Sequence, residues 1–577
     1  MGTIYANDAV RIKVKKIIVA HGIMDGHAHH NSGACCPMPL TYAQVAETIK
    51  INPRRIPVMR RREVLERLIG IAFKEGVKIQ RLSTFKMGNV LAKLNRQTFA
   101  NIISSTDFAD EFTEKKDGSP VATPIIIATM DMERAHIAGY EGQTIYHEEK
   151  GRLFYYKRKS GLVPENEGIK VRLFHEFEEN EVDKSKALKL KVWAVQFDET
   201  WKAAIKNPLH LLPLYFYDPR RFNRPAGTKM PESMEYGAWD KIFDYIATDN
   251  KPGIWAGVKM YPPLWHKPFD ELCEYLPDFY HRCELEKIPI LTHCSPGGMT
   301  THEAEFYGDF DSANEKRREE CRRRQHKKLQ TLAIETGKTV PILKPGRETY
   351  VGFDNTDKKE RSEQDYFFKN YVHPEMWRPV LENFPDLHLC LAHFGGDEWR
   401  RGPLSEWTDS PPSEWIKSTI DLTKKYKNVY TDIACFNLDN KINYDTEGGK
   451  KVRNTFNKML YWMRDRDEYK HLRNKVIFGT DWYLTHLTRD DDGAEYGNYC
   501  RDFKKLIDQV DSTFWIRFTL VNPWECYSMS KDKLRKMADA LKAAGAKEND
   551  LYEKLNLLLK LDDEVSRIKE QLAKWDS

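Results

Sequence analysis

Short apolar segments recur along an otherwise polar chain, and charged or turn residues bound each of them. Runs of this length and setting are typical of buried parallel strands, because helices cover both faces of such a sheet. The runs expected to form strands are Ile17–Met24, Pro124–Met130, Leu211–Tyr217, Gly253–Met260, Ile288–Thr292, Leu387–Ala392, Val429–Ala434 and Lys475–Gly479.

Segments with helical spacing of their apolar positions lie between most of these runs. They are Arg61–Phe73, Ala187–Ile205, Phe269–Glu286, Pro374–Asn383 and Glu414–Lys425. Strands that alternate with helices predict an α/β fold, and a count of eight runs predicts a (β/α)8 TIM barrel. Periodicity alone leaves an open, doubly wound sheet as the alternative.

The chain has 577 residues, far more than the ~250 typical of such a barrel. We therefore expect residues 1–530 to form a barrel with large insertions at about 134–185 and 295–372. The aromatic and basic residues around Ser160–Gly161 suggest a β-hairpin in the first insertion. The second is long enough to form a lid or a subdomain beside the catalytic face.

The last segment, residues 531–577, is expected to be a helical extension. Its apolar positions alternate at spacings of three and four, which indicates an amphipathic helix. These positions are Leu558, Leu561, Val565, Ile568, Leu572 and Trp575. We expect this helix to pack on its own barrel, and a contact within a homo-oligomer is the alternative.

Composition limits the class of protein. Hydrophobic residues make up 41% and charged residues 31% of the chain, which suits a large buried core and excludes a disordered or fibrous protein. No apolar run approaches the ~18 residues of a membrane span, and the first residues lack the apolar stretch of a secretory signal. We therefore expect a cytoplasmic protein without a membrane partner. The ten cysteines include no C-x-x-C pair, which indicates reduced thiols and no zinc ribbon.

The distribution of charge is unusual in one segment of the chain only. The net charge of +5 is too small to indicate a general nucleic-acid binder. The segment Glu315–Lys328, however, holds eight basic residues and three acidic ones. A solvated helix with i,i+4 ion pairs is the simpler interpretation, and a patch for anions or polynucleotides is the alternative.

Candidate chemistry begins where the first run ends. Side chains alternate between the two faces of a strand, so Asp25, His27 and His29 should share one face. Two imidazoles could then converge on one metal ion beyond the strand end. An H-x-H pattern alone is weak evidence, because histidine clusters also occur in ordinary polar loops.

Four other apolar runs end on residues that can bind a metal or become a ligand. They are Lys259, His293, His393 and Asp481. In a barrel the carboxyl ends of all strands meet at one mouth, so these side chains can come together. Satisfied core histidines and a salt-bridged lysine would each explain one residue, whereas a metal site explains all of them. Cys294 should point away from His293, and we interpret it as a packing residue.

These motifs, taken in order, resemble those of the amidohydrolase superfamily. They are D-x-H-x-H from Asp25, G-V-K ending at Lys259, the strand-end His293, L-A-H-F-G-G from Leu391 and G-T-D-W from Gly479. The segment His373–Leu387 further resembles the amidohydrolase-related branch that includes metal-dependent decarboxylases. Val521–Trp524 departs from the Asn-Ala pair that this branch often has there.

The resemblance implies a distorted barrel with one or two divalent metal ions at its mouth. His27, His29 and Asp481 would hold the first ion. His293 and His393 would hold a second, bridged by Lys259 if the lysine amine carries a carboxylate. With a single ion, His293 would be a further ligand, and His393 would orient neighbours or act as an acid or base. Imidazole and carboxylate ligands suit zinc best, with manganese or iron as alternatives.

A metal-dependent hydrolase is therefore the leading interpretation. A bound ion lowers the pKa of its water from ~15.7 toward ~7, and Asp481 could pass the proton to the leaving group. The expected substrate is a small molecule with an amide, lactone or ester-type bond. It is expected to be anionic, since Arg220, Arg221 and Arg347 could bind carboxylate or phosphate. The alternatives are a nonoxidative decarboxylase, and a noncatalytic scaffold or nucleic-acid-binding barrel that uses the basic helix at 315–328.

Overall fold

The computed structural model describes the barrel and most of the helices around it. The described residues are 21–29, 84–104, 121–130, 144–149, 152–157, 192–219, 240–264, 266–270, 273, 275–296, 312–337, 368–400, 404–436, 446–481 and 494–576.

Eight parallel strands form one sheet in the order β1-β2-β5-β6-β7-β8-β9-β10. Their bounds are β1 Asp25–His29, β2 Ile125–Ala128, β5 Leu211–Phe216, β6 Gly257–Met260, β7 Ile290–His293, β8 Leu389–Ala392, β9 Val429–Asp432 and β10 Val476–Ile477. Neighbours in the sheet are also neighbours in the order of the barrel runs along the chain, which is the topology of a (β/α)8 barrel. The predicted fold class is confirmed.

Backbone hydrogen bonds between the first and last strands close the barrel. The Gly26 amide donates to the Phe478 carbonyl (2.9 Å), and the Thr480 amide donates to the His27 carbonyl (3.0 Å). Two glycines permit this approach. A Cβ atom at Gly479 would lie 2.7 Å from the His27 Cβ, and one at Gly26 would lie 2.3 Å from the Ile477 Cγ2. An open sheet is thereby excluded.

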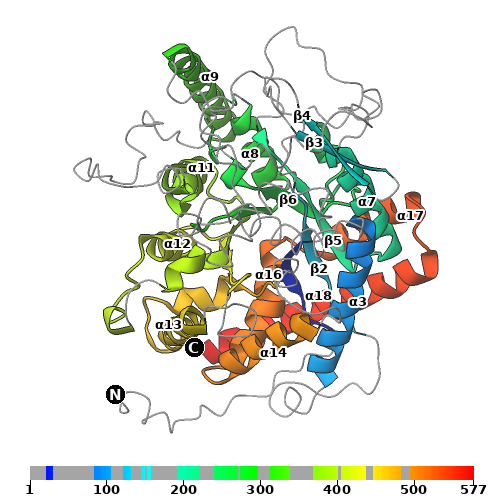
Figure 1. Ribbon diagram of the computed structural model, residues 1–577, viewed down its shortest axis with the longest axis vertical. Helices are drawn as coiled ribbons and strands as arrows, with labels where there is room; N and C mark the ends of the chain where they lie inside the picture. Colours follow the sequence, from blue (N-terminus) through cyan, green and yellow to red (C-terminus); the bar gives the residue numbers. More distant parts are fainter. Residues whose placement is uncertain are drawn as a thin grey trace, which may run out of the picture.

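Helices surround the strands (Figure 1). Their bounds are α3 Thr84–Ser104, α7 Val192–Lys206, α8 Leu276–Leu285, α9 Ser312–Thr336, α11 Arg378–Asn383, α12 Glu414–Lys425, α13 Thr446–Asp465, α14 Ala494–Asp508, α15 Thr513–Ile516, α16 Asn522–Cys526, α17 Lys531–Ala543 and α18 Glu548–Asp576. Short 3-10 and π turns are η6 Lys241–Asp244, η7 Pro262–Leu264, η9 Phe368–Val372, η10 Pro374–Trp377, η11 His393–Arg400, η12 Leu404–Glu406, η13 Lys470–Asn474 and η14 Arg517–Val521.

The first strand lies later in the chain than its apolar run predicts. Six runs contain their strands, β7 extends one residue past its run to His293, and β1 begins at Asp25, just after Ile17–Met24. The predicted bounds of the first strand are therefore wrong, and His27 and His29 belong to β1 itself. Met24 precedes the strand and is fully buried, so it belongs to the hydrophobic core. The more polar residues that follow it form the hydrogen-bonded strand β1.

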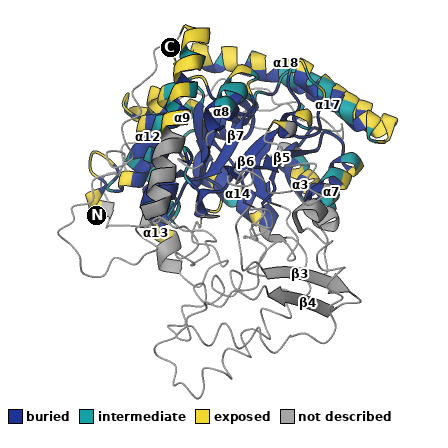
Figure 2. Cartoon of the chain, turned by 90° about the horizontal axis from the view of Figure 1, so that it is seen from above, coloured by how far each residue is buried: buried dark blue, intermediate teal, exposed yellow. Residues whose placement is uncertain are grey.

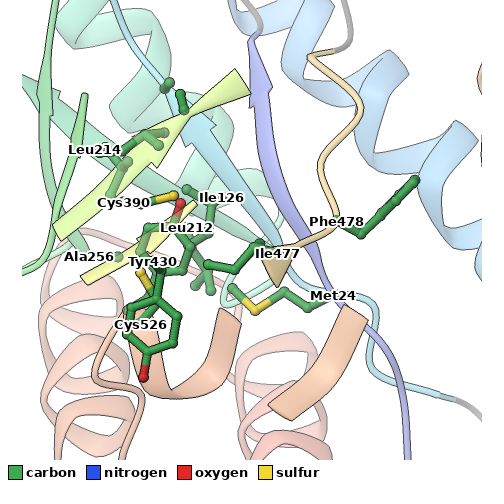
Figure 3. Close-up of a cluster of buried hydrophobic side chains, with 14 of the residues drawn as sticks. Met24, Ile126, Leu212, Leu214, Ala256, Cys390, Tyr430, Ile477, Phe478 and Cys526 are labelled. Carbon is green, nitrogen blue, oxygen red and sulfur yellow. The ribbon is translucent and has the colours of Figure 1, made fainter. Parts of the chain in front are cut away.

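An apolar floor fills the barrel below the polar strand ends (Figure 3). Met24, Ile126, Leu212 and Ile477 come from different strands or their approaches and are fully buried. Tyr430 joins them from β9. Burying an aliphatic side chain of this size contributes roughly 1.5–3 kcal/mol. Side chains two residues further along a strand lie on the same face and one layer nearer the mouth.

The C-terminal helices cover the amino ends of the strands, opposite the mouth. The Lys533 Nζ of α17 donates to the Ala256 carbonyl (2.8 Å), one residue before β6, and to the Tyr527 carbonyl (2.9 Å). Buried and exposed residues alternate along α18 (Figure 2). The buried residues include Leu558, Leu561, Val565, Ile568 and Leu572. The prediction that this helix packs on its own barrel is confirmed, whereas the domain boundary at residue 530 stays a prediction.

Parts of both predicted insertions are described. In the first, β3 (Thr144–Glu149) and β4 (Arg152–Lys157) form an antiparallel hairpin. Its register pairs Glu149 with Arg152, so the predicted position of the reversal at Ser160–Gly161 is wrong. A β-hairpin in this insertion is nevertheless confirmed.

Helix α9 carries the basic segment and packs on α8 through a narrow stripe. The Gln325 Nε2 donates to the Asp270 and Cys273 carbonyls (both 2.8 Å), and Leu329 is buried. Arg323 and Lys327 are exposed. These side chains are solvent-exposed, and the choice between a solvated charged face and an anion-binding patch stays a prediction. No helix among the described residues is both long and apolar enough to cross a membrane.

We expect Lys533→Ala to lower the free energy of unfolding by about 2 kcal/mol, because two buried carbonyl oxygens lose their donor. Denaturant unfolding followed by far-UV circular dichroism measures this change. Lys531→Ala on the same helix is the matched control, since Lys531 makes only an exposed ion pair with Asp563. The control should stay within about 0.5 kcal/mol of the wild type. Equal effects of both substitutions would contradict a special role for the buried lysine.

Candidate metal centre

Three predicted ligands converge at the mouth, at the seam where β1 meets the chain after β10. The His27 Nε2 lies 3.2 Å from the His29 Nε2, and the His29 Nε2 lies 3.2 Å from the Asp481 Oδ1. The third edge, from His27 Nε2 to Asp481 Oδ1, is 3.7 Å. Atoms bonded to one tetrahedral zinc ion at ~2.0–2.2 Å lie about 3.3 Å apart. The triangle therefore fits a single ion.

The other predicted residues extend this group across the mouth. The Lys259 Nζ, at the end of β6, lies 3.3 Å from the His27 Nε2. The His393 ring lies 5.2 Å from the His27 ring and 4.7 Å from the His293 ring, between centroids. The His293 Nε2 lies 3.2 Å from the Ser295 Oγ. Strand ends far apart in the sequence thus supply one row of imidazoles.

Hydrogen bonds orient three of these rings in the same way. The Nδ1 atoms of His27, His29 and His393 lie 2.9 Å from Asp432 Oδ2, 2.8 Å from the Ala128 carbonyl and 3.1 Å from the Ala434 carbonyl. Carbonyl and carboxylate oxygens only accept, so we assign the ring proton to Nδ1 in each case. With the proton on Nδ1, each ring turns the lone pair of Nε2 toward the mouth. A cation is what such converging lone pairs bind.

Burial controls the charge states of the site. Burial, with the nearby Lys259 charge, lowers the pKa of His27 to about 4, so this imidazole is neutral at pH 7. Burial also lowers the pKa of Lys259 to about 8. His27 therefore enters the ligand triangle as a neutral ring.

Two of the strand-end residues have strained backbones. His393 has φ 70° and Asp481 has φ 49°. Both values lie in the left-handed backbone region, which residues other than glycine rarely adopt. Hydrogen bonds to other strands hold both: the His393 amide donates to Asp432 Oδ1 (2.9 Å), and the Asp481 amide donates to the His27 carbonyl (2.9 Å). Such strain persists where the surrounding structure over-determines the conformation, which is common at functional sites.

Asp432 belongs to the site but was not among the predicted residues. It ends β9 fully buried and contacts both His27 and His393. Its signal in the sequence is a lone carboxylate inside the apolar run Val429–Ala434. A single charge does not interrupt the strand pattern of an otherwise apolar run, so the pattern predicts a strand there and no site residue.

Asp25 has a different place from the one that strand alternation predicts. The β1 register shifts between Asp25 and Ala28. The Asp25 carboxylate accepts hydrogen bonds from the Thr480 Oγ1 and the Tyr496 hydroxyl (both 2.8 Å). Burial raises its pKa to about 7. This carboxyl group therefore ties β1 to the segment after β10 and to α14.

Several other predicted residues have structural roles or lie outside the described chain. Cys294 is buried and its Sγ donates to the Val372 carbonyl (3.3 Å), which confirms it as a packing residue. The Asn522 Nδ2, in the segment that departs from the family pattern, donates to the Val476 carbonyl (2.6 Å) and supports β10. Arg220, Arg221 and Arg347 lie outside the described residues. A second ion held by His293, His393 and Lys259 stays a prediction.

Comparison with known proteins shows similarity to solved structures. No protein-family model and no curated protein matches the chain. One solved structure that matches is a probable 2-pyrone-4,6-dicarboxylic acid hydrolase from Acinetobacter baumannii with citric acid bound. It is 10% identical, covers 55% of this chain and 98% of its own, and has a TM-score of 0.20. The function of this chain has to be argued from its own site.

We expect the purified protein to bind a divalent ion, and His29→Gln to lose this binding because one corner of the ligand triangle is removed. Elemental analysis and zinc titration measure the stoichiometry. His210→Gln is the matched control, since His210 is also buried but precedes β5 at the opposite end of the barrel, where its Nε2 contacts the Ala92 carbonyl. Equal zinc binding by His29→Gln and the wild type would contradict the assignment.

Proposed function

We propose that this protein is a metal-dependent hydrolase that cleaves an amide, lactone or ester-type bond of an anionic small molecule. One observation carries the proposal: the Nε2 atoms of His27 and His29 and the Oδ1 of Asp481 form a triangle with edges of 3.2–3.7 Å. The resemblance of the strand-end motifs to the amidohydrolase superfamily supports it. We propose zinc as the cofactor, because imidazole and carboxylate ligands suit that ion.

His27, His29 and Asp481 would hold the ion, with His293 as a further ligand. Bound there, a divalent cation would supply Lewis acidity toward a water molecule and toward the substrate carbonyl. The chain's own groups have to position the reactants and move the proton. A site this deeply buried also excludes bulk water, which strengthens electrostatic interactions inside it.

Asp481 is the proposed proton acceptor. Its Oδ1 is buried and accepts no hydrogen bond from the described part of the chain, so this oxygen can take a proton from the attacking water. His393 is the proposed second acid or base. Because its Nδ1 is bound to the Ala434 carbonyl, its Nε2 is the atom that can exchange a proton with the leaving group.

Lys259 adds a charge that can be adjusted near the reacting atoms. Its amine is fully buried beside His27, and its pKa is lowered to about 8. A protonated Nζ would stabilise negative charge that develops on the substrate oxygen. An unprotonated Nζ could instead take up carbon dioxide as a carbamate and bridge to a second ion.

We expect Asp481→Asn to lower kcat by about 10²–10⁴, because an amide accepts a proton poorly and binds a cation weakly. Steady-state kinetics on a verified substrate measure this loss, and thermal unfolding checks that the fold is kept. Asp467→Asn is the control, since Asp467 is an exposed surface carboxylate paired with Lys470. Near-normal turnover by Asp481→Asn would show that the assigned role is wrong.

The reaction class can be tested with the zinc-loaded wild-type protein. A panel of anionic amides, lactones and esters would be incubated with it, and the new carboxyl group and released carbon dioxide would be measured separately. Hydrolysis gives the carboxyl product without carbon dioxide, as the proposal requires. Carbon dioxide release would identify the decarboxylase alternative. A protein that binds no divalent ion and turns over no substrate would favour the scaffold alternative.

Selection of an anionic substrate is assigned to Arg220, Arg221 and foremost Arg347. These residues lie outside the described chain, and the proposal rests on the general rule that loops after barrel strands carry the ligand-binding residues. We expect Arg347→Ala to raise KM for an anionic substrate about tenfold, the loss expected for one charge-assisted hydrogen bond. A neutral analogue should show a much smaller change. Equal changes in KM for both substrates would leave Arg347 only a structural role.

A further inference from the structure

Two carboxylates reach the candidate centre, and their surroundings differ. His27, His29 and Asp481 form one group with ligand-type atoms within 4.8 Å of one another, and His27, His393 and Asp432 form another. Distance alone would make both groups candidate cation sites. The hydrogen bonds around each carboxylate separate them.

The Asp432 carboxylate has all of its acceptor positions in use. Its Oδ1 accepts from the backbone amides of His393 (2.9 Å) and Ala434 (3.0 Å). Its Oδ2 accepts from the His27 Nδ1 (2.9 Å) and from the Cys390 thiol (3.7 Å). An ionised carboxylate offers about four lone-pair positions, so these four donors leave none for a cation.

The Asp481 carboxylate is the opposite case. Its Oδ1 is buried and accepts no hydrogen bond from the part of the chain that the structure describes. The nearest group is the His29 Nε2 at 3.2 Å, which carries a lone pair when the His29 Nδ1 donates to the Ala128 carbonyl. An open oxygen that faces lone pairs is what a cation ligand requires.

We infer that Asp432 is a positioning residue rather than a ligand: it fixes the His27 ring in the Nδ1–H form and anchors the strained backbone of His393 at the same time. This inference rests on the proposed metal-dependent function and deepens it. A carboxylate that holds a ligating histidine selects the tautomer that presents Nε2 to the ion. Here one side chain on β9 serves an imidazole from β1 and another that follows β8.

The test substitution is Asp432→Asn. The amide oxygen has to face the amides of His393 and Ala434, so the amide NH₂ takes the place of Oδ2 and donates to the His27 Nδ1. The His27 proton then moves to Nε2, where it blocks the lone pair. We expect nitrogen-15 NMR of the histidine-labelled, metal-free protein to show His27 as Nδ1–H in the wild type and as Nε2–H in the variant. The His27→Gln spectrum assigns the signal.

Zinc affinity is the second readout, measured by competition with a chelator. We expect Asp432→Asn to weaken zinc binding about 10–100-fold, the usual cost of losing such a partner. Asp25→Asn is the matched control, because Asp25 is also a fully buried carboxylate that accepts backbone amides but contacts no imidazole nitrogen among the hydrogen bonds described here. It should keep the His27 Nδ1–H signal and zinc affinity within about threefold.

Two results would overturn the inference: the same His27 tautomer in wild type and Asp432→Asn, or loss of zinc binding by Asp25→Asn to the same degree. If Asp432→Asn does not fold, the wild-type spectrum decides, because a His27 Nε2–H form in the metal-free wild type contradicts the inference. A wild type that binds no zinc would contradict the proposed function instead. The tautomer would still decide what Asp432 does to His27.

Discussion

The closure of the barrel at His27 is the constraint on which the site depends. The His27 carbonyl accepts the amides of Thr480 and Asp481, which joins the first strand to the chain after the last one. The same closure sets the Asp481 carboxylate beside the imidazoles of His27 and His29. Without this closure, residues more than 450 positions apart in the sequence would not lie in one cluster. Gly479 is required because any side chain there would meet the His27 Cβ.

The interior of the closed barrel has an apolar layer at one end and a polar layer at the other. Apolar side chains fill the amino half, and the C-terminal helices seal it with Lys533 bound to two backbone carbonyls. The candidate ligands lie toward the carboxyl ends of the strands, and Asp25 lies at the start of β1. Burial there is costly for charged groups unless partners compensate it, and the structure supplies such partners. Asp432 and Asp25 each accept several donors from neighbouring strands.

The two carboxylates of the site, Asp432 and Asp481, have different hydrogen-bond partners. This difference determines which of them can bind a cation. A carboxylate with all acceptors satisfied orients its neighbours, whereas one with an open oxygen can bind a cation or take a proton. Strain at His393 and Asp481 places these two side chains where an ordinary strand end would not. The hydrogen bonds and the backbone strain together bring common residue types into one oriented group of side chains.

The sequence by itself indicated an α/β fold with eight strands, because apolar runs that alternate with helical segments allow few architectures, and only the hydrogen bonds between the first and last strands decided for a closed barrel over an open sheet. It also indicated His27, His29, Lys259, His293, His393 and Asp481, since each follows or interrupts an apolar run at the same end of its strand. Tertiary structure alone decided the start of β1, the turn of Asp25 away from the imidazoles and the place of Asp432. These depend on strand register, on a bulge and on which lone pairs find donors. Such features arise from contacts between distant segments, which a pattern along the chain does not contain.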